Sequence, residues 1–237
     1  MRMQQKRKVN LPFFEIGPKS YLFGDDILEL AKAADDAAAK YGVDIIFTTP
    51  IVDIRRVREA TSHIHVFAPH MDPIYPGRGL ADILPESLVA AGADGVMLNH
   101  CEKPLSLDVL QETIRRANEV GLTTIVCSDS LADAGKIAGL KPDIIVAEPS
   151  ELIGTGISVG KAYVEAATKA VKDVDPDILV LTAAGIANGD DVYSTIVAGA
   201  DATGSSSGIA RALDRAAMVD EMIAAVRRGW DDRNGNQ

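Results

Sequence analysis

Cysteine is scarce in this sequence. The 237 residues contain only two cysteines, Cys101 and Cys127, and no Cys-x-x-Cys spacing. Disulfide frameworks and zinc ribbons need several cysteines at characteristic spacings. The sequence therefore indicates neither of these scaffolds, and we expect a cytoplasmic protein of a reducing compartment.

Long apolar runs and an excess of positive charge are missing as well. No stretch approaches the roughly 18 consecutive apolar residues of a membrane-spanning helix. The basic start, with Arg2, Lys6, Arg7 and Lys8, has no apolar core of the signal-peptide type after it. The formal net charge of −10 opposes nonspecific attraction to nucleic acid or anionic lipid. We therefore expect neither nucleic acid nor membrane among the partners.

The size and the apolar content are those of an ordinary enzyme domain. With 237 residues and 47% hydrophobic residues, the chain is close to the roughly 250 residues typical of a (β/α)₈ barrel. No Pro-, Gly- or Ser-rich linker divides it. We predict one domain over residues 1–237, with short polar tails at 1–8 and 231–237.

Short β-branched runs alternate with longer, alanine-rich segments of helical spacing. Eight strands are predicted, at 9–16, 44–49, 63–68, 95–99, 123–127, 143–147, 177–181 and 202–205. Helices are predicted between and after them, at 26–41, 52–60, 85–91, 106–120, 130–137, 160–174, 189–198 and 211–228. Eight such units with nearly continuous apolar strands favour an α/β fold of one closed, parallel (β/α)₈ barrel.

An open, doubly wound sheet is the alternative fold. Its dinucleotide-binding form carries Gly-x-Gly-x-x-Gly after the first strand. That motif does not follow the first predicted strand here. The barrel therefore remains the preferred prediction.

Two short stretches carry most of the functional information, Leu98-Asn99-His100-Cys101-Glu102 and Ala147-Glu148-Pro149-Ser150-Glu151-Leu152-Ile153-Gly154-Thr155-Gly156. Each follows an apolar strand, so an imidazole and a carboxylate are predicted at strand ends. Such a pair suggests proton transfer. The glycines after the carboxylate suggest a loop that closes and offers backbone N–H groups to an anion.

In a barrel, the residues that follow the strands gather at one catalytic face. The polar and glycine positions predicted there are Lys19, His70, Asp72, His100, Glu102, Glu148, Gly154, Gly185, Ser206 and Ser207. They include a cation, a neutral polarising group, a base and an anion pocket. This set suits abstraction of a proton beside a carbonyl in a small phosphorylated substrate.

These residues carry a clear resemblance to a known family. From about Lys19 to Asp214 the sequence resembles triosephosphate isomerase in its compact, archaeal-type form. Further matching segments are Asp53-Ile54-Arg55-Arg56-Val57, His70-Met71-Asp72-Pro73, Ile83-Leu84-Pro85-Glu86 and Gly185-Ile186. The resemblance implies an aldose-ketose isomerase of glycolysis and gluconeogenesis, with glyceraldehyde 3-phosphate and dihydroxyacetone phosphate as the leading pair.

The resemblance also implies roles for individual residues. Glu148 would move the proton, His100 would polarise the carbonyl, and Lys19 would neutralise the phosphate and the developing enediolate. Glu102 would hold nearby charged groups in place. The phosphate would be bound by Gly154, Gly185, Ser206 and Ser207. No cofactor or metal is implied, and the expected assembly is a homodimer or homotetramer.

Departures from the family pattern cluster at the predicted site. Gly17 stands where the family usually has an Asn two residues before the lysine, and the last strand, Ala202-Thr203-Gly204-Ser205, is small and polar where relatives begin with bulky aliphatic residues. A related substrate, such as a tetrulose phosphate, is therefore an alternative. Two other classes stay open: a metal-dependent barrel enzyme with His70, Asp72, His100 and Glu148 as ligands, and a noncatalytic phosphosugar-binding barrel.

Overall fold

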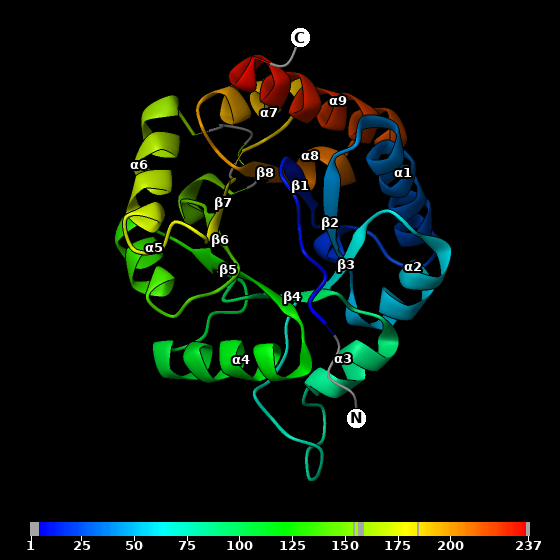
Figure 1. Ribbon diagram of the computed structural model, residues 1–237. Helices are drawn as coiled ribbons and strands as arrows, with labels where there is room; N and C mark the ends of the chain where they lie inside the picture. Colours follow the sequence, from blue (N-terminus) through cyan, green and yellow to red (C-terminus); the bar gives the residue numbers. More distant parts are fainter. Residues whose placement is uncertain (1–4, 154, 156–158, 184, 236–237) are drawn as a thin grey trace.

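The chain forms a closed barrel of parallel strands. A computed structural model describes residues 5–153, 155, 159–183 and 185–235. Over these residues eight strands pair in chain order, and β1 closes the barrel by pairing with both β2 and β8 (Figure 1). The strands are β1 Phe13–Ile16, β2 Asp44–Thr48, β3 His65–Ala68, β4 Gly95–Leu98, β5 Thr123–Ser128, β6 Ile144–Ala147, β7 Leu179–Thr182 and β8 Ala202–Ser205. The predicted (β/α)₈ barrel, a single domain, is confirmed.

Helices surround the barrel on its outside (Figure 1). They are α1 Asp25–Tyr41, α2 Ile54–Ala60, α3 Pro85–Ala91, α4 Leu107–Val120, α5 Leu131–Ala138, α6 Lys161–Lys172, α7 Gly189–Val197, α8 Ser207–Ala210 and α9 Arg215–Asn234. Short 3₁₀ helices follow three strands, as η1 Lys19–Tyr21, η2 Ile51–Asp53 and η3 Ser150–Leu152. Within the described residues, none of the helices has the length and apolarity that would let it cross a membrane.

Alternation along the strands builds two separate cores. Successive side chains of a strand point to opposite faces. In β1, Phe13 belongs to the cluster inside the barrel, whereas Phe14 and Ile16 belong to the larger cluster between the strands and the helices. In β2, Ile46 faces inward, and Ile45 faces the helices. The barrel interior is therefore packed with side chains.

The first strand is shorter than predicted. The prediction began it at Val9, but pairing starts at Phe13. Pro12 precedes this residue and has no backbone N–H with which to extend the ladder. Its carbonyl still accepts a hydrogen bond from the Asp44 N–H at 3.2 Å. Val9 is buried in the inner cluster without being part of the strand.

The amino-terminal segment is not a free tail over its described part. The Lys6 ammonium lies 2.6 Å from an Asp143 carboxylate oxygen, and Arg7 donates to the carbonyl of Ile64 at 2.8 Å. These partners stand just before β6 and β3. The basic residues thus cross the amino-terminal end of the barrel, a contact that sequence spacing does not reveal.

The carboxyl-terminal prediction also needs two corrections. The helix predicted over 211–228 begins later, at Arg215 of α9, because Asp214 caps it by accepting the Ala217 N–H at 3.0 Å; the short α8 ends before this segment, at Ala210. The tail predicted from 231 is helical as far as Asn234. Arg233 donates to the carbonyls of Ile196 and Ala200 at 2.8 and 2.6 Å. Tertiary bonding to the α7 region therefore extends a helix whose polar sequence suggested fraying.

Candidate active site

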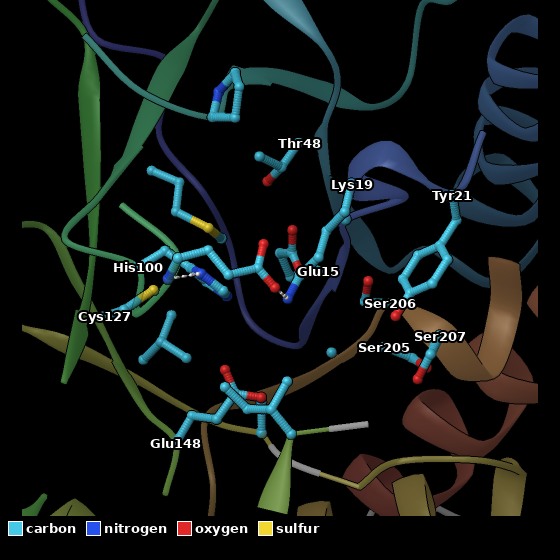
Figure 2. Close-up of a pocket in the computed structure, with 18 of the residues that line it drawn as sticks. Glu15, Lys19, Tyr21, Thr48, His100, Cys127, Glu148, Ser205, Ser206 and Ser207 are labelled. Carbon is cyan, nitrogen blue, oxygen red and sulfur yellow. Dashed lines mark hydrogen bonds and ion pairs between the residues drawn. The ribbon is translucent and has the colours of Figure 1, made fainter. Parts of the chain in front are cut away.

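A cavity of about 660 Å³ opens at the carboxyl ends of the strands. Figure 2 shows that Lys19, His100 and Glu148 enter it from different elements. The predicted site residues that line the cavity are Lys19, His100, Glu102, Glu148, Gly185, Ser206 and Ser207. Gly154, the remaining predicted phosphate-binding residue, lies outside the described residues. The barrel thus brings together groups from the β1, β4, β6, β7 and β8 ends.

Lys19 and Glu102 form an ion pair across the mouth of this cavity. The Lys19 Nζ lies 3.0 Å from the Glu102 Oε1. Partial burial acts to raise the pKa of Glu102, but the hydrogen bond and the positive charge of Lys19 outweigh it and lower that pKa. Lys19 has a φ of 49°, in the left-handed region that non-glycine residues rarely occupy. The backbone and Glu102 together aim the ammonium into the cavity.

The local hydrogen bonding of His100 fixes its tautomer. The backbone N–H of Glu102 donates to His100 Nδ1 at 3.1 Å. Nδ1 is therefore the acceptor, and a neutral ring carries its proton on Nε2. Burial lowers the pKa of His100, and the nearby charge of Lys19 lowers it further. His100 is thus prepared as a neutral hydrogen-bond donor.

Asn99 holds the turn that carries this imidazole. Its φ of 57° directs the chain sharply out of β4. Its amide donates to the Cys127 carbonyl at 3.0 Å, and its Oδ1 accepts the Leu105 N–H at 2.9 Å. These two bonds tie β5 and the following loop to the turn, so Asn99 positions His100 without lining the cavity.

Glu148 is a carboxylate that burial makes more basic. It follows β6 directly, and its backbone N–H donates to the Ser128 carbonyl at 3.1 Å. Burial raises the pKa of Glu148 to about 7, whereas the charge of Lys19 opposes the shift. A carboxyl with a pKa near the working pH is suited to accept a proton from carbon and return it.

Polar groups line the opposite side of the cavity, which the sequence predicts to be its anion-binding end. Ser206 and Ser207 follow β8, and Gly185 comes from the loop after β7. The Ser206 hydroxyl is buried and has no hydrogen-bond partner among the described residues. A Cβ on Gly208 would stand only 2.7 Å from the Ile186 carbonyl oxygen, so glycine lets the two loops approach closely.

Arg211 is a site residue that the sequence interpretation missed. It lines the cavity just after α8. Its guanidinium lies over the Tyr21 ring, 4.9 Å from the ring centre, and Tyr21 lines the cavity too. The signal was present as a basic residue four positions after Ser207, at the start of the region interpreted as the last helix. Arg211 adds a second cation to this end of the cavity.

Glu15 was missed as well. Its side chain comes from the middle of β1 and lines the cavity close to Lys19 in Figure 2. The sequence signal was a single carboxylate between apolar neighbours, Phe14 and Ile16. Interpreted as part of an ordinary strand, this residue received no role.

The metal-ligand set considered from the sequence does not assemble. His70 lines the cavity, but its Nε2 pairs with Asp72 at 3.2 Å, and the other oxygen of Asp72 accepts the Ile83 N–H at 2.7 Å. Among the described residues, which include His70, Asp72, His100 and Glu148, no group of three or more His, Cys, Asp or Glu side chains is arranged to hold a metal ion. The metal-dependent alternative is therefore not favoured by the arrangement of these four residues.

Comparison with known proteins identifies the family of this chain. The family model described as triosephosphate isomerase matches residues 19–219. A triosephosphate isomerase of Sulfolobus acidocaldarius is 35% identical over 226 residues, which cover 94% of this chain and 98% of that relative. Triosephosphate isomerases of Methanothermus fervidus and Methanocaldococcus jannaschii are each 37% identical over 206 residues, covering 86% of this chain and 92% and 94% of those relatives. The resemblance to archaeal relatives is confirmed, and the chain belongs to the triosephosphate isomerase family.

Proposed function

We propose that this protein interconverts glyceraldehyde 3-phosphate and dihydroxyacetone phosphate through an enediolate. Membership of the family supports the reaction. The observation that carries the proposal is the neutral tautomer of His100, which faces the same cavity as Lys19 and the basic carboxylate of Glu148. A base, an electrophilic donor and a cation are the groups that enolisation requires.

In the proposed reaction Glu148 removes a proton from the carbon beside the substrate carbonyl. The C–H electron pair becomes the C=C bond of the enediolate, and the carbonyl electron pair moves to oxygen. His100 stabilises that oxygen by donating its Nε2–H. A proton then passes from the neighbouring hydroxyl to the former carbonyl oxygen, with His100 as the group that relays it, while Glu148 returns its proton to the carbon that was the carbonyl carbon. The hydroxyl carbon becomes the new carbonyl, all electrons stay within the substrate, and neither an oxidant nor a cofactor is needed.

Lys19 and the anion-binding end would hold the substrate in register. The Lys19 ammonium balances the negative charge of the phosphate and of the enediolate. Glu102 keeps it aimed through their 3.0 Å ion pair. The phosphate would be bound by Gly185, Ser206 and Ser207, with Arg211 beside them. Gly154, in the loop that the sequence predicts to close over the substrate, stays part of the proposal as a phosphate-binding residue.

A coupled assay with glyceraldehyde 3-phosphate tests the proposal. We expect a kcat/KM above about 10⁶ M⁻¹s⁻¹ that EDTA does not change. Glu148→Gln removes the base without changing its size and should lower kcat by about 10²- to 10⁴-fold. A panel of four- and five-carbon phosphosugars in the same assay compares substrates. If triose phosphate does not react but a longer phosphosugar does, the proposed substrate is wrong. If phosphosugars bind but none reacts, the proposal that the protein is an enzyme is wrong.

The assembly and the location stay predictions. A homodimer or homotetramer, a cytoplasmic setting and a role in glycolysis or gluconeogenesis follow from the resemblance and the composition. Light scattering of the purified protein at several concentrations measures the mass of the particle and so tests the first of them.

A further inference from the structure

Glu15 places a carboxyl in the apolar interior of the barrel. It occupies the third position of β1, where its side chain is 9% exposed. Because Phe14 and Ile16 face the helices, the alternation of the strand turns Glu15 inward. The strand side chains beside it at the floor of the cavity are largely apolar, and they include Met97, Cys127, Val146 and Leu181.

Burial of this carboxyl has an energetic cost that the described residues do not compensate fully. A buried polar group is normally hydrogen-bonded, and an unpaired one destabilises the fold. The Oε1 of Glu15 is buried and has no hydrogen-bond partner among the described residues. A strand position of this kind would be filled more stably by a valine or leucine. A carboxyl kept here therefore points to a role in binding or chemistry.

Two glycines make the space that this carboxyl occupies. A Cβ on Gly17 would lie 2.9 Å from Glu15 Oε1, which is closer than real Cβ contacts allow. A Cβ on Gly204 would lie 3.2 Å from Oε2 and 2.8 Å from the Glu15 carbonyl oxygen. Gly17 and the small last strand are the departures from the family pattern noted in the sequence. In the structure, these two departures and Glu15 lie next to one another, so they form one local change relative to the family pattern.

We propose that Glu15 contacts the substrate: in its protonated form the carboxyl donates a hydrogen bond to an oxygen of the bound phosphosugar, from the space left by Gly17 and Gly204. The inference rests on the proposed isomerase function and adds a residue to it. Glu15 would thereby supply, from within β1, a polar contact that the side chain missing at position 17 cannot make. An apolar site can keep a carboxylic acid neutral so that it donates.

The charges around Glu15 are compatible with a neutral carboxyl at neutral pH. Burial raises the pKa of Glu15 to about 7; the Thr48 hydroxyl beside it acts to lower this pKa, the negative charge of Glu148 acts to raise it, and the charge of Lys19 acts to lower it. Cys127, on β5, is the other titratable group facing it. Because Glu148 must be ionised to act as the base, the active form of the two carboxyls holds one proton, and that proton is on Glu15.

The pH dependence of kcat/KM distinguishes this role from a structural one. The wild-type protein should lose activity below about pH 7, as Glu148 gains a proton, and again above it, as Glu15 loses one. Glu15→Gln keeps a neutral donor of nearly the same shape. It should stay within about threefold of wild-type activity at pH 6.5 and lose the decline on the alkaline side. Glu15→Ala should lower kcat/KM by about 10-fold or more.

Glu59→Gln, on the exposed face of α2, is the matched control and should leave the profile unchanged. An alkaline decline that persists in Glu15→Gln would overturn the proposal, and so would full activity in Glu15→Ala. Thermal unfolding identifies a variant that fails to fold; because Gln is nearly isosteric with Glu, the Gln variant keeps the test decisive if the Ala variant is lost.

Failure of the proposed reaction is a separate outcome, since wild type would then not turn over triose phosphate at any pH. In that event, titration of wild type and Glu15→Gln with 2-phosphoglycolate by calorimetry tests the contact itself. The proposal expects both to bind, with affinity falling more steeply above pH 7 in wild type, where Glu15 and Glu148 both ionise, than in the variant, where Glu148 alone does. An equal dependence on pH in the two proteins would overturn it.

Discussion

At the amino-terminal end of the barrel the charged side chains are paired, whereas at the carboxyl-terminal end several polar atoms have no partner. Asp143 binds Lys6 at 2.6 Å, and Asp94 binds Arg58. At the other end, Glu15 Oε1 and Ser206 Oγ are buried without partners among the described residues. Paired groups stabilise the fold, and unpaired ones are available to a ligand. The two ends of the same strands therefore serve stability and chemistry separately.

Replacement of His100, at the carboxyl-terminal end, should have the largest effect on activity. Its replacement by alanine removes the proposed donor to the enediolate and should lower kcat by about 10²- to 10³-fold, with little change in the midpoint of thermal unfolding. His63→Ala is the control, because His63 is exposed at the amino-terminal end. Equal activity of the two variants in the coupled assay would remove His100 from the mechanism.

Replacement of Arg211 tests the contribution of a second cation at the carboxyl-terminal end. Arg211→Gln removes a cation from the end of the cavity where Ser206 and Ser207 are proposed to bind the phosphate. It should lower kcat/KM by about 10- to 100-fold, mostly through KM, since a hydrogen bond to a charged group contributes about 1.5–3 kcal/mol. Inorganic phosphate should inhibit this variant more weakly than wild type.

Arg228→Gln is the matched control for Arg211, because Arg228 also lies over an aromatic ring, that of Tyr193 at 4.7 Å, but does not line the cavity. Similar KM values for the two variants would show that Arg211 contributes no specific phosphate binding.

Asp143 tests the opposite end. It accepts the Thr124 N–H at 2.8 Å and the Thr124 hydroxyl at 2.9 Å, besides binding Lys6. Asp143→Ala should lower the free energy of unfolding by about 2 kcal/mol, measured by urea denaturation, while kcat/KM stays within about twofold. Asp173→Ala, which loses only an exposed pair with Lys169, should cost less than about 0.5 kcal/mol. A large loss of activity in Asp143→Ala would contradict the separation of the two ends.

The pH dependence of stability extends the comparison to the buried carboxyl groups of the cavity. The pKa of Glu15 is raised to about 7 from an ordinary 4.5, so between these values the folded protein holds a proton that the unfolded chain has lost. Its contribution to the free energy of unfolding is present below about pH 4.5 and is lost as the pH rises toward 7. Glu148 has the same sign, whereas the lowered pKa of His100 acts oppositely below about pH 6.5.

Comparison of wild type with Glu15→Gln isolates the contribution of Glu15 to this dependence. Urea denaturation at pH 5 and pH 7.5 should show a smaller fall in stability for the variant. An identical fall in both proteins would mean that Glu15 titrates alike in the folded and unfolded chains.

Much of this site could be predicted because its markers lie close together in the chain. An imidazole or a carboxylate directly after an apolar strand identifies His100 and Glu148, and the barrel places all strand ends on one face. Arg211 and Glu15 carried no comparable local pattern. A basic residue near a helix and a single carboxylate within a strand usually have no catalytic meaning, and only the cavity shows where they point.

The sequence by itself determined the alternation of strands and helices, the closed eight-unit fold and the strand ends that carry the reactive groups, because periodicity and turn chemistry act over a few neighbouring residues. Tertiary structure alone decided the bracing of Lys6 and Arg7 across the amino-terminal end, the extension of α9 to Asn234, and the niche that Gly17 and Gly204 form around Glu15. These contacts join residues far apart in the chain, and closure of β1 against β8 creates the last of them. Such long-range contacts leave no pattern among neighbouring residues of the sequence, because they exist only in the closed barrel.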